Sequence, residues 1–316
     1  MKISIIGPGI MPIPPEGWGG VEILIWDYTT ILRQFGHDVQ IVNTPNYDEI
    51  KNQVNSYNPD FVHLHYDVFW EVMKDINCQN KAMTSHFGYI EQDEKNGWYM
   101  PILNGFLNSN CHIFSLSPGI AECYVKRGLP IERSHVTPNG ARKDLIRFEK
   151  ECEFPNKTIF LGKVECRKRQ SIFMHNQSIN FVGKCVDTNF NMELPNFLGE
   201  WNKLKLYNDL TKYANLILLS DGECHPAVCS EGLMAGLGLV LSEYAIANLD
   251  ISKDFIDVIP EDKINNIDYV NSIIDNNRKK SLILRNEIRE YALKEFDYEN
   301  KTVPHYLNVI KETFGI

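Results

Sequence analysis

Short apolar runs alternate along the chain with longer amphipathic segments. Runs of this length that are apolar throughout are typical of strands buried on both faces of a parallel sheet. Between them the pattern is helical, most clearly over 20–36, where apolar residues recur three and four positions apart. This alternation predicts right-handed crossovers and parallel sheets covered by helices. The expected strands are 2–7, 38–43, 60–65, 81–86, 112–117, 158–163, 178–184, 214–220, 237–243 and 254–260.

The pattern is interrupted once, in the polar stretch 139–157, which contains Asn-Gly and Phe-Pro pairs typical of turns. A chain of 316 residues is long enough for two domains. We therefore expect an α/β protein with two Rossmann-like domains, 1–148 and 149–296, whose parallel sheets face each other across a ligand-binding cleft. The tail is expected to form helices at 263–277 and 281–295 and, at Pro304, a helix start or a kink.

The composition narrows the functional class. The chain carries 41 acidic and 32 basic residues, a formal net charge of −9, which disfavours binding to nucleic acid or to anionic membranes. An anion site must then be a local basic cluster, and any membrane contact is peripheral at most. The opening MKISIIGPGIMPIPP is too short and too rich in proline for a signal peptide or a membrane span. The eight cysteines include no C-x-x-C pair, which favours reduced thiols and a cytoplasmic location.

The stretch DGECHPAVCSEGLMAGLGLV at 221–240 contains two cysteines and a histidine close together. Cys224 and His225 are adjacent, so their side chains diverge, and Cys229 has no second pair at a zinc-type spacing. We therefore expect no metal here and interpret the cysteines as small packed hydrophobes.

The same stretch predicts a helix that follows a strand and a loop. Pro226 suits the first turn of a helix, whose N-terminus at Pro226, Ala227 and Val228 offers backbone N–H groups and a positive dipole end to an anion. Glu223 lies just before the helix and Glu231 about two turns into it. Carboxylates on either side of a bound diphosphate can accept hydrogen bonds from sugar hydroxyls. A lone glutamate pair of this spacing is also compatible with a solvated loop residue and a helix salt bridge.

With its flanks, this stretch resembles the nucleotide-sugar motif of retaining glycosyltransferases of family 4, which have the GT-B fold. The usual motif is of the type E-G-F-G-L-V-x-x-E-A-M-A-x-G-x-P-V-V. Glu223 and Glu231 keep the spacing of its two glutamates, and the helix also ends in small residues, while Gly232 and Gly236 are departures.

Three further segments resemble the same family in the same order along the chain. WGGVEILIWDYTTILRQFGHDV (18–39) is similar to its G-G-x-E loop and first helix. VTPNGARKD (136–144) is similar to the segment before the linker, and IFLGKVECRKRQ (159–170) to a G-R-x-x-x-x-K-G loop. His86, at the end of an expected strand, matches the family's cleft histidine, which contacts the donor sugar.

The last of these segments holds the densest basic cluster of an acidic chain. Gly162 and Lys168 match the family loop, whereas Lys163 replaces its arginine and Arg169 its final glycine; Arg167 adds a further cation. Cations near a leaving diphosphate would stabilise the charge that develops on it. Lysine in place of arginine gives up bidentate geometry and weakens phosphate binding.

The resemblance implies a retaining hexosyltransferase that moves a sugar from a UDP- or GDP-linked donor to a hydroxyl group. It implies no cofactor and no divalent metal, because the helix dipole and basic residues hold the diphosphate. It also implies that a C-terminal helix at 297–316 completes the first, acceptor-binding domain, and that 149–296 binds the donor. The implied catalytic residues are His86, Glu223, Lys163 and Lys168. The implied donor-binding residues are Gly19, Gly20, Gly162, Lys163, Lys168, Pro226, Ala227, Val228 and Glu231.

Loops are expected to decide specificity. The acceptor, a glycan, a lipid or a small molecule, would be read by the first domain, including the loop GYIEQDEKNGWYM, with His63, His65 and Asp67 as secondary candidates. The loop 196–207 is expected to recognise the base, with Trp201 either packed near it or exposed at a helix start. The base, the sugar, the linkage and the formation of a homodimer stay open.

Two other functions fit the same scaffold. A nucleotide-sugar 2-epimerase also needs a carboxylate, basic residues and a histidine. A catalytically degenerate nucleotide-sugar-binding protein is suggested by the departures at Lys163, Arg169 and Gly232.

Overall fold

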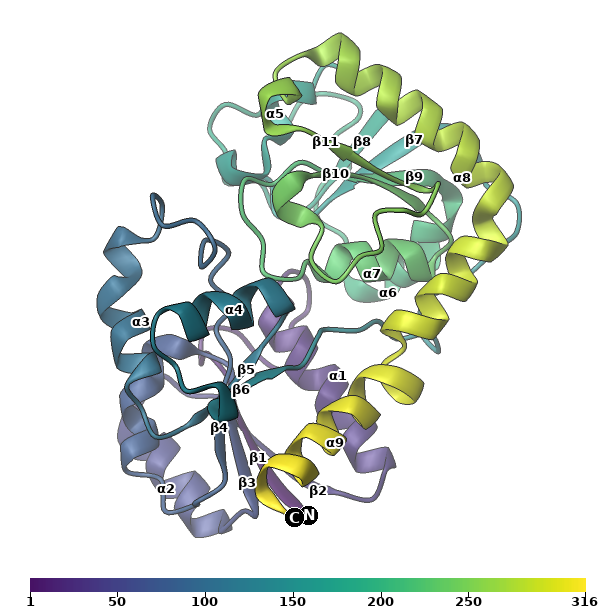
Figure 1. Cartoon of the computed structure of the whole chain (residues 1–316). Coiled ribbons are helices and arrows are strands. Elements are labelled where there is room, and N and C mark those ends of the chain that lie inside the picture. The colour runs from purple at the N-terminus through teal and green to yellow at the C-terminus, as the bar shows by residue number, and fades with distance from the viewer. The chain divides into compact units, whose positions relative to one another are not determined.

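The computed structural model describes the whole chain, from Met1 to Ile316, and the chain divides into two compact units. The first unit comprises Met1–Pro15, Gly19–Asn139 and Tyr298–Ile316, and the second comprises Glu16–Trp18 and Gly140–Asp297. Each unit contains one parallel sheet with helices packed against it (Figure 1). The division after Asn139 lies ahead of the boundary at 148/149 that the sequence suggested.

The sheet of the first unit has six parallel strands in the order β2-β1-β3-β4-β5-β6. They are β1 (Lys2–Ile6), β2 (Asp38–Val42), β3 (Phe61–Leu64), β4 (Lys81–Met83), β5 (His112–Ser115) and β6 (Ser134–Val136). The first five confirm the strands expected from the apolar runs. β6 was not expected, because this edge strand is only three half-buried residues long and has no apolar run.

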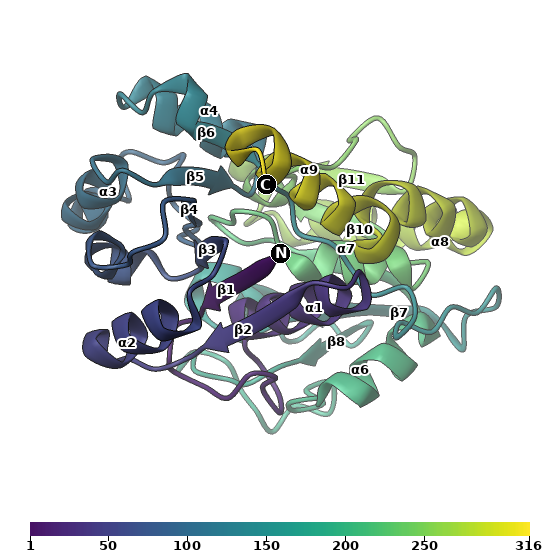
Figure 2. The same ribbon diagram turned by 90° about the horizontal axis from the view of Figure 1, so that it is seen from below.

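Five α-helices belong to the first unit: α1 (Gly20–Gln34), α2 (Tyr47–Tyr57), α3 (Met100–Leu107), α4 (Pro118–Lys126) and α9 (Val303–Phe314). Figure 2 shows α1 and α9 on one side of the sheet and α2 and α3 on the other. In α1, Leu24, Tyr28 and Leu32 are buried at helical spacing, as the sequence pattern predicted.

The last helix of the chain belongs to the core of the first unit. Tyr306 and Ile310 of α9 pack in the same apolar cluster as Leu24 and Tyr28 of α1. The rings of Tyr28 and Tyr306 meet edge to face, with centroids 4.9 Å apart. Pro304 lies in the first turn of α9, where a missing N–H leaves no hydrogen bond unmade, so it marks a helix start and not a kink.

The sheet of the second unit has five parallel strands in the order β11-β10-β9-β7-β8. They are β7 (Phe154–Leu161), β8 (Ile179–Val182), β9 (Tyr213–Leu218), β10 (Gly238–Ser242) and β11 (Ile256–Ile259). All five were expected from the sequence. Every residue of the central strands β9 and β10 is buried, which explains why their sequences are apolar without alternation.

Four α-helices belong to the second unit: α5 (Gln170–Phe173), α6 (Lys203–Asp209), α7 (Ala227–Met234) and α8 (Ile267–Phe296). α8 is one continuous helix of 30 residues, so the prediction of two helices at 263–277 and 281–295 was wrong. Asn277, Ser281 and Arg285, four positions apart, are all buried on one face of α8. Polar residues on the buried face break the hydrophobic periodicity, although the helix itself continues. Neither α8 nor any other helix is long and apolar enough to cross a membrane.

Candidate functional site

Two loops of the second unit meet where neighbouring parallel strands end. β7 ends at Leu161 and is followed by a loop with a 3-10 turn at Cys166–Lys168, and β9 ends at Leu218 and is followed by the loop that carries Glu223. Since β7 and β9 pair in parallel, the loops leave the same edge of the sheet. The backbone N–H of Asp221 donates to the carbonyl of Arg167 at 2.9 Å and ties them together.

The side chain of Lys168 folds over Gly162. Gly162 has a φ of 132°, a conformation that favours glycine, and a Cβ there would lie 2.8 Å from the Lys168 Nζ. The Lys168 side chain is only 12% exposed, and its Nζ lies 3.9 Å from Oε1 of Glu223. The structure thus brings three of the expected residues, Gly162, Lys168 and Glu223, into one site.

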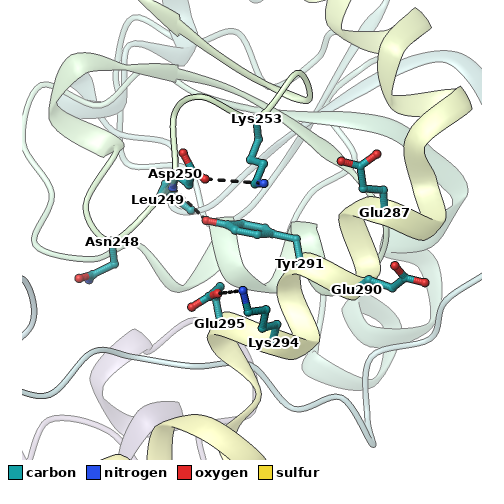
Figure 3. Close-up of a pocket in the computed structure, with 9 residues that line it drawn as sticks. All are labelled: Asn248, Leu249, Asp250, Lys253, Glu287, Glu290, Tyr291, Lys294 and Glu295. Atoms are coloured by element: carbon teal, nitrogen blue, oxygen red, sulfur yellow. Dashed lines mark hydrogen bonds and ion pairs between the residues drawn. The ribbon is translucent and has the colours of Figure 1, made fainter.

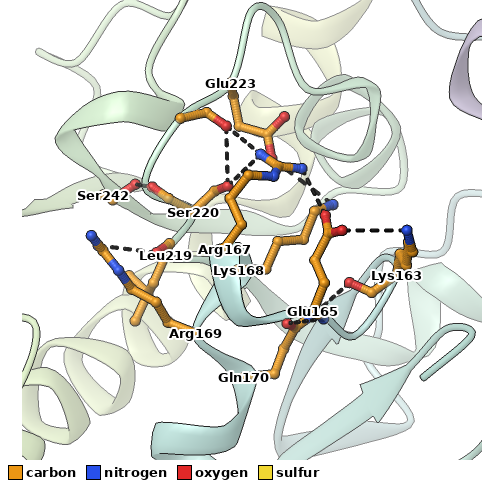
Figure 4. Close-up of polar contacts among 11 residues, drawn as sticks. Lys163, Glu165, Arg167, Lys168, Arg169, Gln170, Leu219, Ser220, Glu223 and Ser242 are labelled. Carbon is orange, nitrogen blue, oxygen red and sulfur yellow. Dashed lines mark hydrogen bonds and ion pairs between the residues drawn. The ribbon is translucent and has the colours of Figure 1, made fainter. Parts of the chain in front are cut away.

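Arg167 is the centre of the polar contacts between the two loops (Figure 4). Its Nη1 donates to Oγ of Ser220 at 2.8 Å, to Oε1 of Glu223 at 3.0 Å and to the carbonyl of Gly222. Its Nη2 donates to Oε1 of Glu165 at 2.9 Å. Burial alone would lower the pKa of Arg167, but the two glutamates outweigh it and hold the pKa above its usual value. Arg167 therefore joins the two loops through four acceptors.

Lys163 pairs with the same Glu165. Its Nζ lies 3.5 Å from Oε2 of Glu165, and its side chain is about a third exposed. Glu165 therefore bridges Lys163 and Arg167 with its two carboxylate oxygens. Neither the position of Glu165 nor its contacts were anticipated from the sequence.

Arg169 faces away from this cluster. It has a φ of 60°, the left-handed conformation that suits the glycine of the family loop. Its guanidinium pairs with Glu261 at 2.8 Å and donates to the carbonyl of Leu219 at 3.3 Å. Of the four cations in the basic segment, Lys163, Arg167 and Lys168 share the carboxylates Glu165 and Glu223, whereas Arg169 belongs to a separate ion pair.

α7 begins directly after this loop. Pro226 is the residue before the first helical residue, Ala227, and Val228 follows in the first turn. Glu231 is 5% exposed and accepts a hydrogen bond from Nζ of Lys203, which begins α6, at 2.7 Å. The two glutamates of the E-x₇-E pair therefore have different basic partners, and Lys203 was not anticipated from the sequence.

The cysteines and the histidine in this stretch are packed into the protein. Cys229 is completely buried, and Cys224 and His225 are nearly so. Burial raises the pKa of the Cys229 thiol and lowers the pKa of His225 to about 4, which keeps both groups neutral near pH 7. No group of three or more His, Cys, Asp or Glu side chains in the chain could hold a metal ion.

The glycine loop of the first unit precedes α1, which starts at Gly20. Gly19 has a φ of 136°, and a Cβ there would lie 2.7 Å from Cε of Met11. A Cβ on Gly20 would meet nothing within 4 Å. Local packing therefore explains a glycine at position 19 and leaves the glycine at position 20 without a structural reason.

His63 lies in β3, His65 directly after β3, and His86 three residues after β4. His86 Nε2 lies 3.4 Å from Nδ1 of His65, and burial lowers the pKa of His86 to about 4. His63 is fully buried between Tyr306 and Thr84, at 3.0 and 2.8 Å. The Thr84 hydroxyl donates to the carbonyl of Phe114, so it accepts from Nε2–H of His63, and Nδ1 accepts from Tyr306. His63 is thus a structural residue and not an acceptor-side candidate.

A buried carboxyl group adjoins these histidines. Asp67 accepts hydrogen bonds from the hydroxyls of Ser85 and Tyr99, and burial raises its pKa to about 6. Tyr99 stacks on Phe87, and Trp98 meets Phe87 edge to face at 5.3 Å. Asp67 was a secondary candidate in the sequence, but its hydroxyl partners are distant along the chain and carried no signal.

Trp201 lies in the apolar core of the second unit and is 8% exposed. Of the two alternatives for Trp201, exposure at a helix start does not hold, because the side chain is buried in the core and α6 begins two residues later, at Lys203. The Nζ of Lys205 lies over the indole ring of Trp201, 4.7 Å from the ring centroid.

A separate cavity of about 540 Å³ lies beside α8 and contains none of the expected site residues (Figure 3). The backbone N–H of Asp250 donates to the hydroxyl of Tyr291 at 2.9 Å. Lys253 and Lys294 pair with Asp250 and Glu295, at 3.7 and 3.4 Å. The cavity is therefore lined by both acidic and basic side chains.

No protein-family model matches the sequence, and no curated protein is similar to it. The structure is similar to solved structures over nearly its whole length. Sucrose-phosphate synthase from Thermosynechococcus elongatus has a TM-score of 0.78 at 14% identity, with 99% of each chain covered. WaaG, a glycosyltransferase of lipopolysaccharide biosynthesis, has a TM-score of 0.71 at 12% identity, with 98% of this chain and 99% of WaaG covered. HepE from Anabaena, solved with UDP-glucose, has a TM-score of 0.67 at 15% identity, with 100% of this chain and 99% of HepE covered. The chain has the GT-B fold, as its sequence predicted.

Proposed function

We propose that this chain is a retaining glycosyltransferase of the family 4 type. It transfers a sugar from a UDP- or GDP-linked donor to a hydroxyl group of a glycan, a lipid or a small molecule. The observation that carries the proposal is the approach of Lys168 to Glu223, at 3.9 Å, at the ends of adjacent parallel strands and directly before α7. A cation for a diphosphate and a carboxylate for a sugar then lie side by side.

The diphosphate is assigned to the basic side of this site. Lys163 and Lys168 stabilise the charge that develops on the leaving phosphate, each worth up to ~4 kcal/mol at 4 Å in an effective dielectric of 20. The start of α7 at Pro226, Ala227 and Val228 adds its positive dipole end. Divalent metal is not required in this scheme, because these groups supply the positive charge.

The glycines are assigned to the backbone that approaches the diphosphate. Gly162 leaves room for Lys168 in the second unit. In the first unit, the open space around Gly20 supports a role beyond local packing, and Gly19 gives the loop its turn.

The carboxylates are assigned to hydroxyl groups. Glu223 accepts hydrogen bonds from the donor sugar, and Glu231 accepts them from the ribose through Oε2, since Lys203 occupies Oε1. His86 contacts the donor sugar as a neutral hydrogen-bonding group, in keeping with its lowered pKa of about 4. The bond between the anomeric carbon and the diphosphate breaks in a front-side, ion-pair-like substitution, and the acceptor oxygen bonds to that carbon from the same face. The nucleoside diphosphate is the leaving group, and its phosphate accepts the proton of the acceptor hydroxyl. This course retains the anomeric configuration.

The two units divide the work in this proposal. Residues 1–148, completed by 297–316, bind the acceptor, and 149–296 bind the donor. The GT-B fold supports this division, and the UDP-glucose bound to HepE supports a nucleotide-sugar donor.

Donor hydrolysis without an acceptor tests the proposal. The wild-type protein is incubated with UDP- and GDP-sugars, and release of the nucleoside diphosphate is measured with and without EDTA. Glu223→Ala is expected to lower the rate by orders of magnitude, and Glu193→Ala, a change at an exposed glutamate, to leave it unchanged. EDTA is expected to have no effect.

Three outcomes would contradict the proposal. A protein that no nucleoside diphosphate stabilises at millimolar concentration binds no such donor. Binding without hydrolysis in either form would indicate a binding module. A sugar converted to its 2-epimer without an acceptor would indicate an epimerase.

A further inference from the structure

Glu165 lies among the cations that the proposed function assigns to the diphosphate (Figure 4). Its Oε2 lies 3.5 Å from Nζ of Lys163, and its Oε1 accepts from Arg167 at 2.9 Å. The Glu165 side chain is only 22% exposed. A carboxylate in this place is a built part of the site and not a freely solvated charge.

The three cations differ in how far they are committed to the protein. Arg167 donates to Ser220, Gly222, Glu223 and Glu165, so it braces the two loops and is the most heavily committed of the three cations. Lys163 is the most exposed of the three and has Glu165 as its one carboxylate partner. Lys163 is therefore the cation that an incoming anion can take over with the least rearrangement.

We propose that Glu165 is an internal counter-ion that competes with the diphosphate for Lys163. When a nucleoside diphosphate binds, its phosphate replaces Glu165 on Lys163, and Glu165 keeps its contact with Arg167. The carboxylate thus lowers the affinity of the site for diphosphates and favours release of the nucleoside diphosphate product. This inference rests on the proposed function of the same site.

The test is the affinity of Glu165→Gln for UDP, GDP and pyrophosphate, measured by isothermal titration calorimetry. Pyrophosphate is included because it probes the diphosphate site without a base. The variant is expected to bind about tenfold tighter than wild type, the size expected when one charge near an anion is removed at a partly exposed site. The gain is expected to shrink as sodium chloride is raised, because salt screens the lost repulsion.

Glu261→Gln is the matched control. Glu261 pairs with Arg169 at 2.8 Å and is exposed to a similar extent, but it does not touch Lys163. It is expected to change the affinity by less than about twofold, the range for a charge change outside the site. A second variant, Lys163→Met combined with Glu165→Gln, is expected to lose the gain, because the freed lysine is then absent.

The outcomes separate this inference from the proposed function. If wild type binds diphosphates and Glu165→Gln binds them no more tightly, the inference is overturned and the proposed function is not. An equal gain in Glu261→Gln also overturns it, because the effect is then one of net charge. If neither wild type nor any variant binds a diphosphate, although all variants unfold at the same temperature as wild type, both the inference and the proposed function are overturned.

Discussion

Gly183 lies so close to Gly162 that a Cβ on Gly183 would overlap the carbonyl oxygen of Gly162. The two glycines follow the neighbouring parallel strands β8 and β7, and both have positive φ, 146° and 132°. The path of the loop that carries the basic residues therefore depends on the residue that follows the neighbouring strand β8.

We predict that Gly183→Ala destabilises the protein by about 3 kcal/mol, because left-handed strain adds to a clash with backbone that cannot move aside. Gly199→Ala is the control, since Gly199 also has a positive φ of 69° but open space around it. It is expected to cost about 1 kcal/mol, the strain alone. Urea unfolding measures both, and equal losses would show that the close approach to Gly162 carries no cost.

Lys203 and Lys205 are neighbours on α6 with different partners. Lys203→Met leaves the buried Glu231 without its cation, and we expect a loss of about 3 kcal/mol in unfolding free energy. Lys205→Met breaks a half-exposed pair with Asp209 and the contact of its ammonium group with Trp201, and it is expected to cost less than about 1 kcal/mol. Adding Glu231→Gln to Lys203→Met is expected to restore part of the loss. Similar losses in the two single variants would contradict the burial argument.

His63 makes stability depend on pH. Burial lowers its pKa in the folded protein to about 3, below the usual value near 6.5, so the unfolded chain takes up the proton first as the pH falls. The contribution of His63 is complete above pH 6.5 and is lost between pH 6.5 and about 3. We expect a loss of about 2 kcal/mol from this residue between pH 8 and pH 5. His63→Gln is expected to lower the stability at pH 8 but to flatten this slope in denaturant unfolding; an unchanged slope would refute the assignment.

Arg285, on α8, connects several segments of the second unit through hydrogen bonds to their backbone carbonyls. Its guanidinium donates to the carbonyls of Glu149, Thr211 and Tyr213. Arg285→Lys keeps the charge but cannot reach all of these acceptors, so a loss of about 3 kcal/mol is expected. Arg147→Lys, at a half-exposed arginine, is expected to stay within about 0.5 kcal/mol of wild type. Urea unfolding of both proteins at pH 7 provides the measurement.

The strands were readable from the sequence because burial on both faces leaves a continuous apolar run, as in β9 and β10. The strand that was missed, β6, is a half-buried edge strand, and burial is the only property that such a pattern detects. The division of α8 into two helices had the opposite cause. Asn277 is buried, but it donates to the carbonyls of Leu239 and Phe255, so a polar residue occupies a core position.

The candidate site was readable in part. Lys168 and Glu223 were both implied as catalytic residues, and they lie side by side because the parallel strands β7 and β9 end at one edge of the sheet. The partners of the charged groups were not readable. Glu165 on Lys163 and Lys203 on Glu231 depend on side-chain directions that sequence spacing does not determine.

Because α9 is C-terminal in sequence but packs in the first unit, the core of that unit cannot be completed until the end of the chain has been synthesised. Tyr306, Val309 and Ile310 belong to the apolar core of the first unit. They emerge from the ribosome only after the whole second unit has been synthesised. The half of the protein that is made first is thus the half whose core is closed last. A truncated mRNA that ends before the codon for Val303 would yield a protein with a complete second unit and a first unit whose apolar surface is exposed. Such a product would be a natural substrate for chaperones and proteases that recognise exposed apolar surface.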